Sequence, residues 1–318
     1  MSINTLPSTV RALLQADPTS KTITLVERPL PIPNFDKGEH LIRVYAAAPC
    51  AGERLWPSFG DIPGKEIITC DDVAGVVVST PEGSPFKVRD EVYARTSYYR
   101  PGCARDYAIV TTDELAGRPC NLSWAESSAV PLAAETAWQA LFKHAGVGNF
   151  DSPNWKGKRI LVTGASGGGW DLGRPDCKSN GGGSGAKQVL NYHSIKIAEW
   201  GQNPLNKVDV IVDCVGGQSL EDAWWCLRDN SVIISINQPP EDRRPVRCEV
   251  SDVRAIFFIM DPSGADLAEI TKLVEKGKCR PIVDSVWPLE QFQNAYERLD
   301  SGRVRGKIIF DLLLNTQK

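Results

Sequence analysis

Short apolar runs separated by turn residues fill the first third of the chain, and each run is only long enough for a strand. Within the runs, apolar and β-branched residues alternate with polar ones, which is typical of strands with one buried face. Turn sequences such as Pro81-Glu82-Gly83 separate the runs. The pattern predicts a mostly antiparallel β domain with strands at 11–15, 22–27, 40–46, 73–79, 91–95 and 106–110.

The pattern changes near Ser123, where helical and strand-like segments begin to alternate. Ser123 and Glu126 have the S-x-x-E spacing of a capping box, and residues 129–142 follow with helical periodicity. Apolar runs of the kind buried in parallel sheets follow at 208–214, 231–236 and 255–259. Further helices are predicted from Ser219, over 267–274 and from Pro288, and a last strand over 307–313. The pattern predicts βαβ units and a tail that returns to the first domain.

One strand of this second part runs directly into a glycine-rich turn. Residues 158–163 are followed by Gly164-Ala165-Ser166-Gly167-Gly168, and such a turn lets the backbone approach a pyrophosphate. Trp170 stands where the third glycine of the motif is expected, and Pro175 excludes the helix that should follow. The sequence therefore predicts a dinucleotide-binding domain whose parallel sheet is incomplete around residues 169–185.

The bulk composition is that of a globular protein of 318 residues, which is long enough for two domains. The net charge of −3 gives no reason to expect nucleic acid or a membrane as a partner. Nine cysteines without C-x-x-C spacing predict free thiols in a reducing compartment. The first 17 residues show no apolar segment typical of a signal peptide, and no run approaches the roughly 20 apolar residues that span a bilayer. We therefore expect a cytoplasmic protein.

Several motifs have the order and spacing of one family. They are Asp71-Asp72-Val73-Ala74-Gly75-Val76-Val77, Val130-Pro131-Leu132, Thr136-Ala137-Trp138-Gln139-Ala140-Leu141, Asp209-Val210-Ile211-Val212-Asp213-Cys214-Val215-Gly216-Gly217 and Gly306-Lys307-Ile308-Ile309. With them the chain resembles the medium-chain dehydrogenase/reductase superfamily, in its zinc-independent quinone-oxidoreductase-like and enoyl-reductase branch. The resemblance implies an α/β fold: a β-rich GroES-like catalytic domain of residues 1–125 and 288–318, and a Rossmann-type doubly wound domain of residues 126–287.

The resemblance implies an oxidoreductase that transfers hydride from NADPH, with NADH not excluded, to an activated C=C bond or a quinone. It assigns cofactor binding to Thr136, Gly164, Ala165, Ser166, Gly167, Gly168, Tyr192, Val215, Gly216, Asn237, Phe258 and Lys307. Tyr98 is the candidate proton donor, and Cys50, Trp56 and Tyr99 are the candidates for binding a small-molecule substrate; core packing is the alternative role. The strand at 255–259 is the candidate edge for a homodimer.

The residue types argue against zinc. Zinc-dependent relatives carry Gly-His-Glu where this chain is taken to have Gly64-Lys65-Glu66, and a protonated lysine is a poor zinc ligand. Cys50 then lacks a histidine partner, and Cys103 is the single cysteine in the region of the structural zinc lobe. We therefore expect no metal. Arg89 occupies a turn position where relatives often have glycine.

The altered segment suggests a shift of reading frame. With one choice of synonymous codons for residues 169–181, reading one base later restores a third glycine and an amphipathic helix. We hypothesise out-of-frame translation that returns to frame near Gly183; a divergent loop and a designed linker over Gly181–Gly185 are the alternatives. Without the helix, no helix N-terminus faces the pyrophosphate, so we expect weak NAD(P)H binding.

Two alternatives to a reductase remain open at this point. The altered segment after Gly168 is also compatible with a catalytically inactive relative or an aberrant gene-model product. The turn at Gly164–Gly168 also fits the G-x-S-x-G of α/β-hydrolases, with Ser166 as nucleophile. That enzyme needs an acid and then a histidine downstream, and only His193, which comes too early, follows Ser166.

Overall fold

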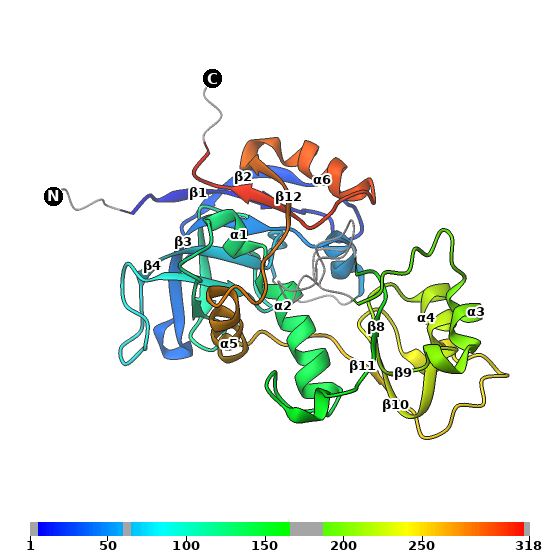
Figure 1. Cartoon of the computed structure of the whole chain (residues 1–318). Helices are drawn as coiled ribbons and strands as arrows, with labels where there is room; N and C mark the ends of the chain where they lie inside the picture. Colours follow the sequence, from blue (N-terminus) through cyan, green and yellow to red (C-terminus); the bar gives the residue numbers. More distant parts are fainter. Residues whose placement is uncertain (1–5, 60–64, 166–186, 315–318) are drawn as a thin grey trace. The chain divides into compact units, whose positions relative to one another are not determined.

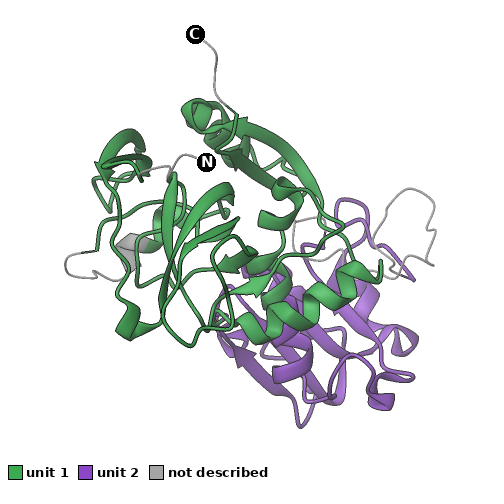
Figure 2. Ribbon diagram, turned by 90° about the vertical axis from the view of Figure 1, so that its left-hand side faces the viewer, with its two compact units in different colours: residues 1–135, 261–318 green, residues 136–260 purple. Residues whose placement is uncertain are grey.

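The computed structural model describes residues 6–59, 65–165 and 187–314, and the chain divides into two compact units (Figures 1 and 2). Unit 1 contains residues 1–135 and 261–318, and unit 2 contains residues 136–260. The sequence-based boundaries at 125/126 and 287/288 differ from this division. The difference has a physical cause, because the helix over 264–275 packs on unit 1, where Tyr93 Oη donates a hydrogen bond to the Leu267 carbonyl at 3.0 Å.

Unit 1 is built mainly of antiparallel strands, as the alternating pattern predicted. Its strands are β1 (Thr9–Leu14), β2 (Thr24–Pro29), β3 (Glu39–Ala48), β4 (Asp72–Ser79), β5 (Glu91–Arg95), β6 (Tyr107–Thr111), β7 (Ala116–Gly117), β12 (Val283–Pro288) and β13 (Lys307–Asp311). One sheet has the order β12-β13-β3-β4-β5-β7, with β6 also paired to β3, and β1 and β2 form a separate pair. The antiparallel pairing of Phe310 in β13 with Ala47 in β3 confirms that the tail returns to the first domain.

The helices of unit 1 are α1 (Trp124–Ser128), α5 (Gly264–Glu275) and α6 (Phe292–Asp300), and α2 (Pro131–Trp138) crosses the boundary between the units. The predicted capping box of α1 is confirmed, because Glu126 N donates to Ser123 Oγ at 3.2 Å and Ser123 N donates to Glu126 Oε2 at 2.9 Å. The predicted helix over 129–142 is present with shifted ends. Pro131 begins α2, as proline suits a first turn, and a π-helical turn over Gln139–His144 follows directly.

Unit 2 is organised around a parallel sheet with the order β11-β10-β9-β8. Its elements are β8 (Ile160–Val162), β9 (Val208–Asp213), β10 (Leu227–Ser235), β11 (Arg254–Phe257), α3 (Ile197–Gln202) and α4 (Gly217–Trp224). The strands confirm the α/β fold. Ser219 does not cap α4, which already begins at Gly217, after Gly216 has turned the chain with a φ of +75°. The predicted defect over 169–185 lies outside the described residues.

Short 3-10 helices complete the chain at Phe35–Lys37, Glu53–Phe59, Pro153–Trp155, Pro204–Asn206, Pro240–Arg243 and Leu289–Gln291. Each unit has its own buried core. In unit 1 the ring of Tyr296 on α6 packs against Phe310 of β13, and in unit 2 Trp224 of α4 packs with Ile211 and Ile233 of the sheet. Burial of such side chains contributes roughly 1.5–3 kcal/mol each. The cores therefore hold the strand ends that carry the candidate sites.

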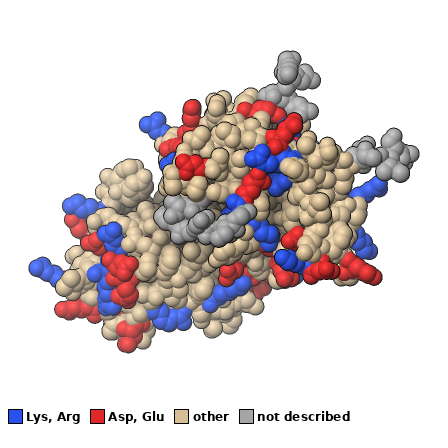
Figure 3. Space-filling model, turned by 180° about the vertical axis from the view of Figure 1, so that it is seen from behind, with Lys and Arg blue, Asp and Glu red and all other residues tan. Residues whose placement is uncertain are grey.

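Acidic and basic side chains are interspersed on the face of the described residues shown in Figure 3. This distribution accords with the small net charge of −3. None of the described helices is long and apolar enough to cross a membrane.

Candidate functional site

The carboxyl ends of three parallel strands in unit 2 bring four of the predicted cofactor residues together. Gly164 follows β8, Val215 and Gly216 follow β9, and Asn237 follows β10. In open α/β sheets this edge is where ligands bind. A Cβ atom at Gly164 would lie 2.9 Å from Val215 Cγ2, and one at Gly216 would lie 2.3 Å from Asn237 Oδ1. Only glycine fits at these two positions.

A buried carboxylate organises this edge. Asp213 ends β9, and its Oδ1 accepts from Thr163 Oγ1 at 2.6 Å. Its Oδ2 accepts from Gly216 N and from Ser235 Oγ, both at 2.9 Å. One side chain therefore connects the ends of β8, β9 and β10. Sequence reasoning did not assign Asp213 a role, although an acidic residue at the end of an apolar strand was the available signal.

The residues at this edge fit a dinucleotide. Gly164 and Gly216 both have positive φ angles, of +66° and +75°, and the space that a Cβ atom would take at each is filled by Val215 and by Asn237. The turns that they form follow strand ends, which is where the main chain of such a sheet approaches a diphosphate or a ribose. Gly217 N at the start of α4 already donates to Gln238 Oε1 at 2.9 Å, so this amide is held in place by the protein itself.

The other residues predicted to bind the cofactor lie in different surroundings. Thr136 is buried in α2, and Phe258 follows β11 and packs on the His144 ring, with centroids 4.3 Å apart. Tyr192 is 73% exposed and stacks on His193. Ala165 is exposed at the end of a described segment, and Ser166, Gly167 and Gly168 lie outside the described residues.

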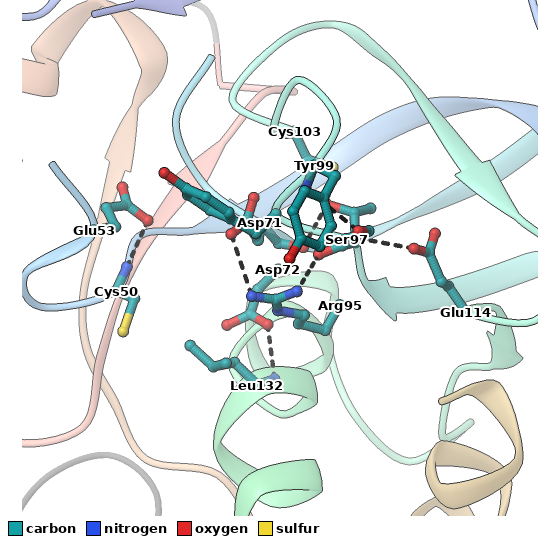
Figure 4. A network of polar contacts seen from close by, with 12 residues as sticks. Cys50, Glu53, Asp71, Asp72, Arg95, Ser97, Tyr99, Cys103, Glu114 and Leu132 are labelled. Atoms are coloured by element: carbon teal, nitrogen blue, oxygen red, sulfur yellow. Dashed lines mark hydrogen bonds and ion pairs between the residues drawn. The ribbon is translucent and has the colours of Figure 1, made fainter. Parts of the chain in front are cut away.

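Lys307 lies in unit 1, where it belongs to a buried ion pair. Its Nζ is 2.8 Å from Asp72 Oδ2, and Asp72 Oδ1 accepts from Leu132 N at 2.7 Å (Figure 4 shows the Asp72–Leu132 contact). Burial alone would lower the pKa of Lys307, but the nearby Asp72, Cys50 and Glu53 raise it above its ordinary value. The ammonium group therefore stays charged and holds Asp72 at the start of β4.

Cys50 and Glu53 form the second part of this network. Cys50 N donates to Glu53 Oε2 at 2.9 Å, and Tyr296 Oη donates to Glu53 Oε1 at 3.0 Å (Figure 4 shows the contact with Cys50). Burial raises the pKa of Cys50 to about 12 and the pKa of Glu53 to about 7. Cys50 is therefore a neutral thiol at neutral pH, and Glu53 gains or loses its proton there.

The structure brings the predicted aromatic residues of unit 1 together. The Trp56 and Tyr98 rings have centroids 6.1 Å apart, and the Tyr98 and Tyr99 rings have centroids 6.2 Å apart. The Lys65 ammonium group lies 3.8 Å from the Tyr98 ring centroid and donates to the Tyr98 carbonyl. Burial lowers the pKa of Lys65 and raises the pKa of Tyr98, while Tyr99 is 75% exposed. Cys50 makes its contacts with Glu53 and Ala51 instead.

Metal ligands are not assembled in the part of the chain that the structure describes: it holds no group of three His, Cys, Asp or Glu side chains that could bind an ion. Lys65 stands where zinc-dependent relatives are expected to carry a histidine ligand, and it donates a hydrogen bond to the Tyr98 carbonyl. Glu66 forms an ion pair with Arg28. Arg89 has a φ of +80°, which is the left-handed conformation expected at a position where glycine is common.

Comparisons with known proteins agree with this geometry. A family model described as zinc-binding dehydrogenase matches residues 184–310. A protein of Arthroderma benhamiae named "Probable zinc-binding oxidoreductase, mitochondrial" is 44% identical over 98% of this chain and 99% of its own length. The mitochondrial NAD(P)H oxidoreductase RTN4IP1 of Danio rerio is 25% identical over 85% of this chain and 78% of its own.

Two further comparisons concern quinone oxidoreductases. The chloroplast envelope quinone oxidoreductase homolog of Arabidopsis thaliana is 29% identical over 77% of this chain and 79% of its own. The solved structure of the quinone oxidoreductase from Coxiella burnetii covers 96% of this chain and 99% of its own, with a TM-score of 0.75 and 22% identity. The solved structure supports the fold, and the relatives' names support an oxidoreductase over the serine hydrolase alternative.

The comparison with the Arthroderma protein includes gaps in this chain. The alignment spans 335 positions, whereas this chain has 318 residues, so at least 17 positions of the relative face gaps in this chain.

The prediction of a cytoplasmic protein is wrong in the light of these relatives. The Arthroderma and Danio proteins are named as mitochondrial, and the Arabidopsis protein as a chloroplast envelope protein. The sequence argument used only the residues near Met1 and the cysteine usage, and these features do not distinguish the cytoplasm from the inside of an organelle.

Proposed function

Because this chain is a quinone-oxidoreductase-like member of the medium-chain dehydrogenase/reductase superfamily, we propose that it is an NAD(P)H-dependent reductase of an activated C=C bond or a quinone. The observation that carries the proposal is the edge of unit 2 at which Asp213 joins three strand ends beside the glycine turns at Gly164 and Gly216. A bound nicotinamide cofactor supplies the hydride. NADPH is the proposed form, and NADH is the alternative.

The residues of unit 2 bind and orient the cofactor in this proposal. Gly164 and Gly216 allow the close approach of the main chain, and Asp213 keeps both turns in position through its hydrogen bonds. Thr136 and Phe258 contribute on the nicotinamide side, and Tyr192 on the adenosine side. Their support is the family resemblance.

Tyr98 is the proposed proton donor. The reduction of an enone or quinone leaves an oxygen or carbon atom that takes up a proton, and a neutral hydroxyl group can deliver it. Burial raises the pKa of Tyr98, which keeps its hydroxyl protonated at neutral pH. Trp56 and Lys65 hold the Tyr98 ring. Trp56 and Tyr99, together with Cys50, are the proposed contacts of the substrate.

The proposed reaction needs no zinc. A catalytic zinc site takes three protein ligands, and the ammonium group of Lys65 has no lone pair to donate while it is protonated. Elemental analysis of the purified protein therefore should find no stoichiometric zinc. One zinc ion per chain that resists dialysis would contradict this part of the proposal.

The proposed partner is a second copy of the chain, joined at β11. This strand lies at one end of the described sheet of unit 2, and its outer edge is open to pairing among the described strands. Light scattering reports the oligomeric state. A monomer at micromolar concentration would exclude the homodimer.

A titration of the purified chain with NADPH tests the proposed function. Binding is followed by nicotinamide fluorescence, with NADH in parallel and a Gly216→Ala variant as the control for the site. Saturable binding that the variant weakens supports the proposal and makes a screen of enones and quinones worthwhile. A folded protein without binding would favour the inactive relative.

Sequencing of the transcript separates the inactive relative from a gene-model product. Codons over residues 169–183 that spell a glycine and an amphipathic helix in the shifted frame support aberrant translation. Codons incompatible with that frame indicate a genuine divergent loop, and the cofactor titration then decides whether this loop still permits binding.

A further inference from the structure

Glu135 is a buried acid outside the networks described above. It lies on α2 and is fully buried, and its Oε1 accepts a hydrogen bond from Ser263 N at 2.7 Å. Its Oε2 has no hydrogen-bond partner among the described residues. A buried acid with one unpaired oxygen is costly, so its presence calls for a reason.

The position of Glu135 in the chain supplies that reason. Glu135 is the last residue of unit 1 before the chain enters unit 2, and Asp261 is the first residue after the chain returns. Each of the two residues therefore lies at one of the two connections between the units. Ser263, two residues after the return, caps α5 by accepting from Asp266 N at 3.2 Å. The bond between Glu135 and Ser263 therefore joins the two connections on the unit 1 side.

Both connections are also fixed to unit 1 next to this bond. Leu132 N, one turn before Glu135, donates to Asp72 at 2.7 Å. Gly264 N donates to the Asp113 carbonyl at 2.6 Å, and a Cβ atom at Gly264 would lie 2.2 Å from the Leu115 carbonyl oxygen. The Glu135–Ser263 bond thus spans two anchored segments.

The surroundings of Glu135 favour its uncharged form. Burial raises the pKa of Glu135 well above its ordinary value, and the nearby Asp72 and Asp266 act in the same direction, while the Ser263 amide and Arg95 oppose them. Burial raises the pKa of Tyr93 on β5, and Glu135 adds to this rise as a lesser cause. A neutral carboxyl group still accepts the Ser263 hydrogen bond and avoids an isolated negative charge.

We propose that Glu135 is a positioning residue that fixes both connections between the units at one point, and thereby the start of the segment that carries Thr136. The proposal rests on the proposed function, in which Thr136 contacts the nicotinamide. Movements between domains are absorbed by residues at the ends of helices and strands. A fixed point there therefore keeps the segment that carries Thr136 from shifting.

Two variants at the same position test the proposal. Glu135→Gln keeps the acceptor oxygen without a charge, and Glu135→Leu keeps a comparable volume without any acceptor. Tyr93→Phe is the matched control, because it removes the hydroxyl that contacts Leu267 and Thr271 of α5 but leaves the connections intact. Hydrogen exchange of the Ser263 amide reports the bond directly and needs no activity.

We expect slow exchange of the Ser263 amide in the natural protein, in Glu135→Gln and in Tyr93→Phe, and exchange at least about tenfold faster in Glu135→Leu. We expect kcat/KM for NADPH to fall at least about tenfold in Glu135→Leu and to stay within about twofold in Glu135→Gln. Equal exchange of this amide in the natural protein and in folded Glu135→Leu overturns the proposal.

Two further outcomes are informative. If Glu135→Leu does not fold, Glu135→Gln decides, because it keeps the acceptor oxygen and the Ser263 amide should stay protected as it is in the natural protein. Loss of protection in Glu135→Gln at neutral pH would contradict the proposal. If exchange changes as expected but neither the natural protein nor any variant binds NADPH, the positioning role stands and the proposed function fails.

Discussion

The ammonium group of Lys307 on β13 lies 2.8 Å from the Asp72 carboxylate on β4, and both side chains are buried. The two residues belong to strands that each flank β3, and Asp72 also receives the Leu132 amide of α2. This pair therefore links the C-terminal strand, the centre of the sheet and the first turn of α2. We expect loss of this ion pair to lower the stability of unit 1 as a whole.

We expect Lys307→Met to lower the free energy of unfolding by about 3–5 kcal/mol, because it leaves the Asp72 carboxylate buried without a counter-charge. Urea unfolding measures the change. The matched control is Lys272→Met, which removes an exposed partner of Glu269 and should cost less than about 1 kcal/mol. A similar loss in both variants would show that the Lys307 pair has no special importance.

Gly216→Ala should abolish or strongly weaken NADPH binding, because its new Cβ would lie 2.3 Å from Asn237 Oδ1 and displace that side chain. Gly217→Ala is the control. Gly217 also has a positive φ, of +54°, but a Cβ atom there would meet nothing within 4 Å. Gly216 also has a ψ of −166°, a region that side chains rarely adopt, so Gly216→Ala bears a further conformational cost of about 1–3 kcal/mol. Equal affinity for NADPH in the two variants would exclude a special role of the Gly216–Asn237 contact.

Asp213→Asn should loosen the edge of the unit 2 sheet, because an amide nitrogen cannot accept the hydrogen bonds that Oδ2 receives from Gly216 N and Ser235 Oγ. Hydrogen bonds to charged groups contribute about 1.5–3 kcal/mol each. We expect reduced thermal stability and weaker NADPH binding. Ser235→Ala, which removes one of these bonds, should have a smaller effect, and the reverse order would contradict the central role of Asp213.

Glu53 should make stability depend on pH. Burial raises its pKa in the folded chain to about 7, above the ordinary value of 4.5. Between these two values the folded chain keeps a proton that the unfolded chain has released, so this group lowers stability as pH rises from about 4.5 to about 7. In Glu53→Gln this contribution is absent. The difference in urea midpoint between the variant and the natural protein should therefore grow in favour of the variant over this range, and a constant difference would contradict the assignment.

The local signals in the sequence predicted local structure well. Ser123 and Glu126 form the expected capping box, and the apolar run that ends at Asp213 is β9. The family resemblance assigned Gly164, Val215, Gly216 and Asn237 to one cofactor, and the structure places each of them after a strand of one parallel sheet. These features can be predicted because each depends on residues that are close together in the sequence, such as the residues of one turn, one strand or the end of one strand.

Contacts between distant residues could not be predicted in this way. Asp72 and Lys307 pair across most of the chain, and Glu135 meets the Ser263 amide only after both connections have formed. The exact start of α4 was also missed, because the φ angle of Gly216 depends on the hydrogen bond from its amide to Asp213. Such features arise from tertiary packing, which no short window of sequence contains.

The division of the chain into units has a consequence for its synthesis on the ribosome. Unit 2 is one continuous segment that is complete once residue 260 has emerged, whereas β3 of unit 1 pairs with β13, which is made after unit 2. Nascent unit 1 therefore carries an unpaired strand edge while unit 2 can already fold. Emergence of residues 307–311 from the ribosome is the event that allows the first sheet to close.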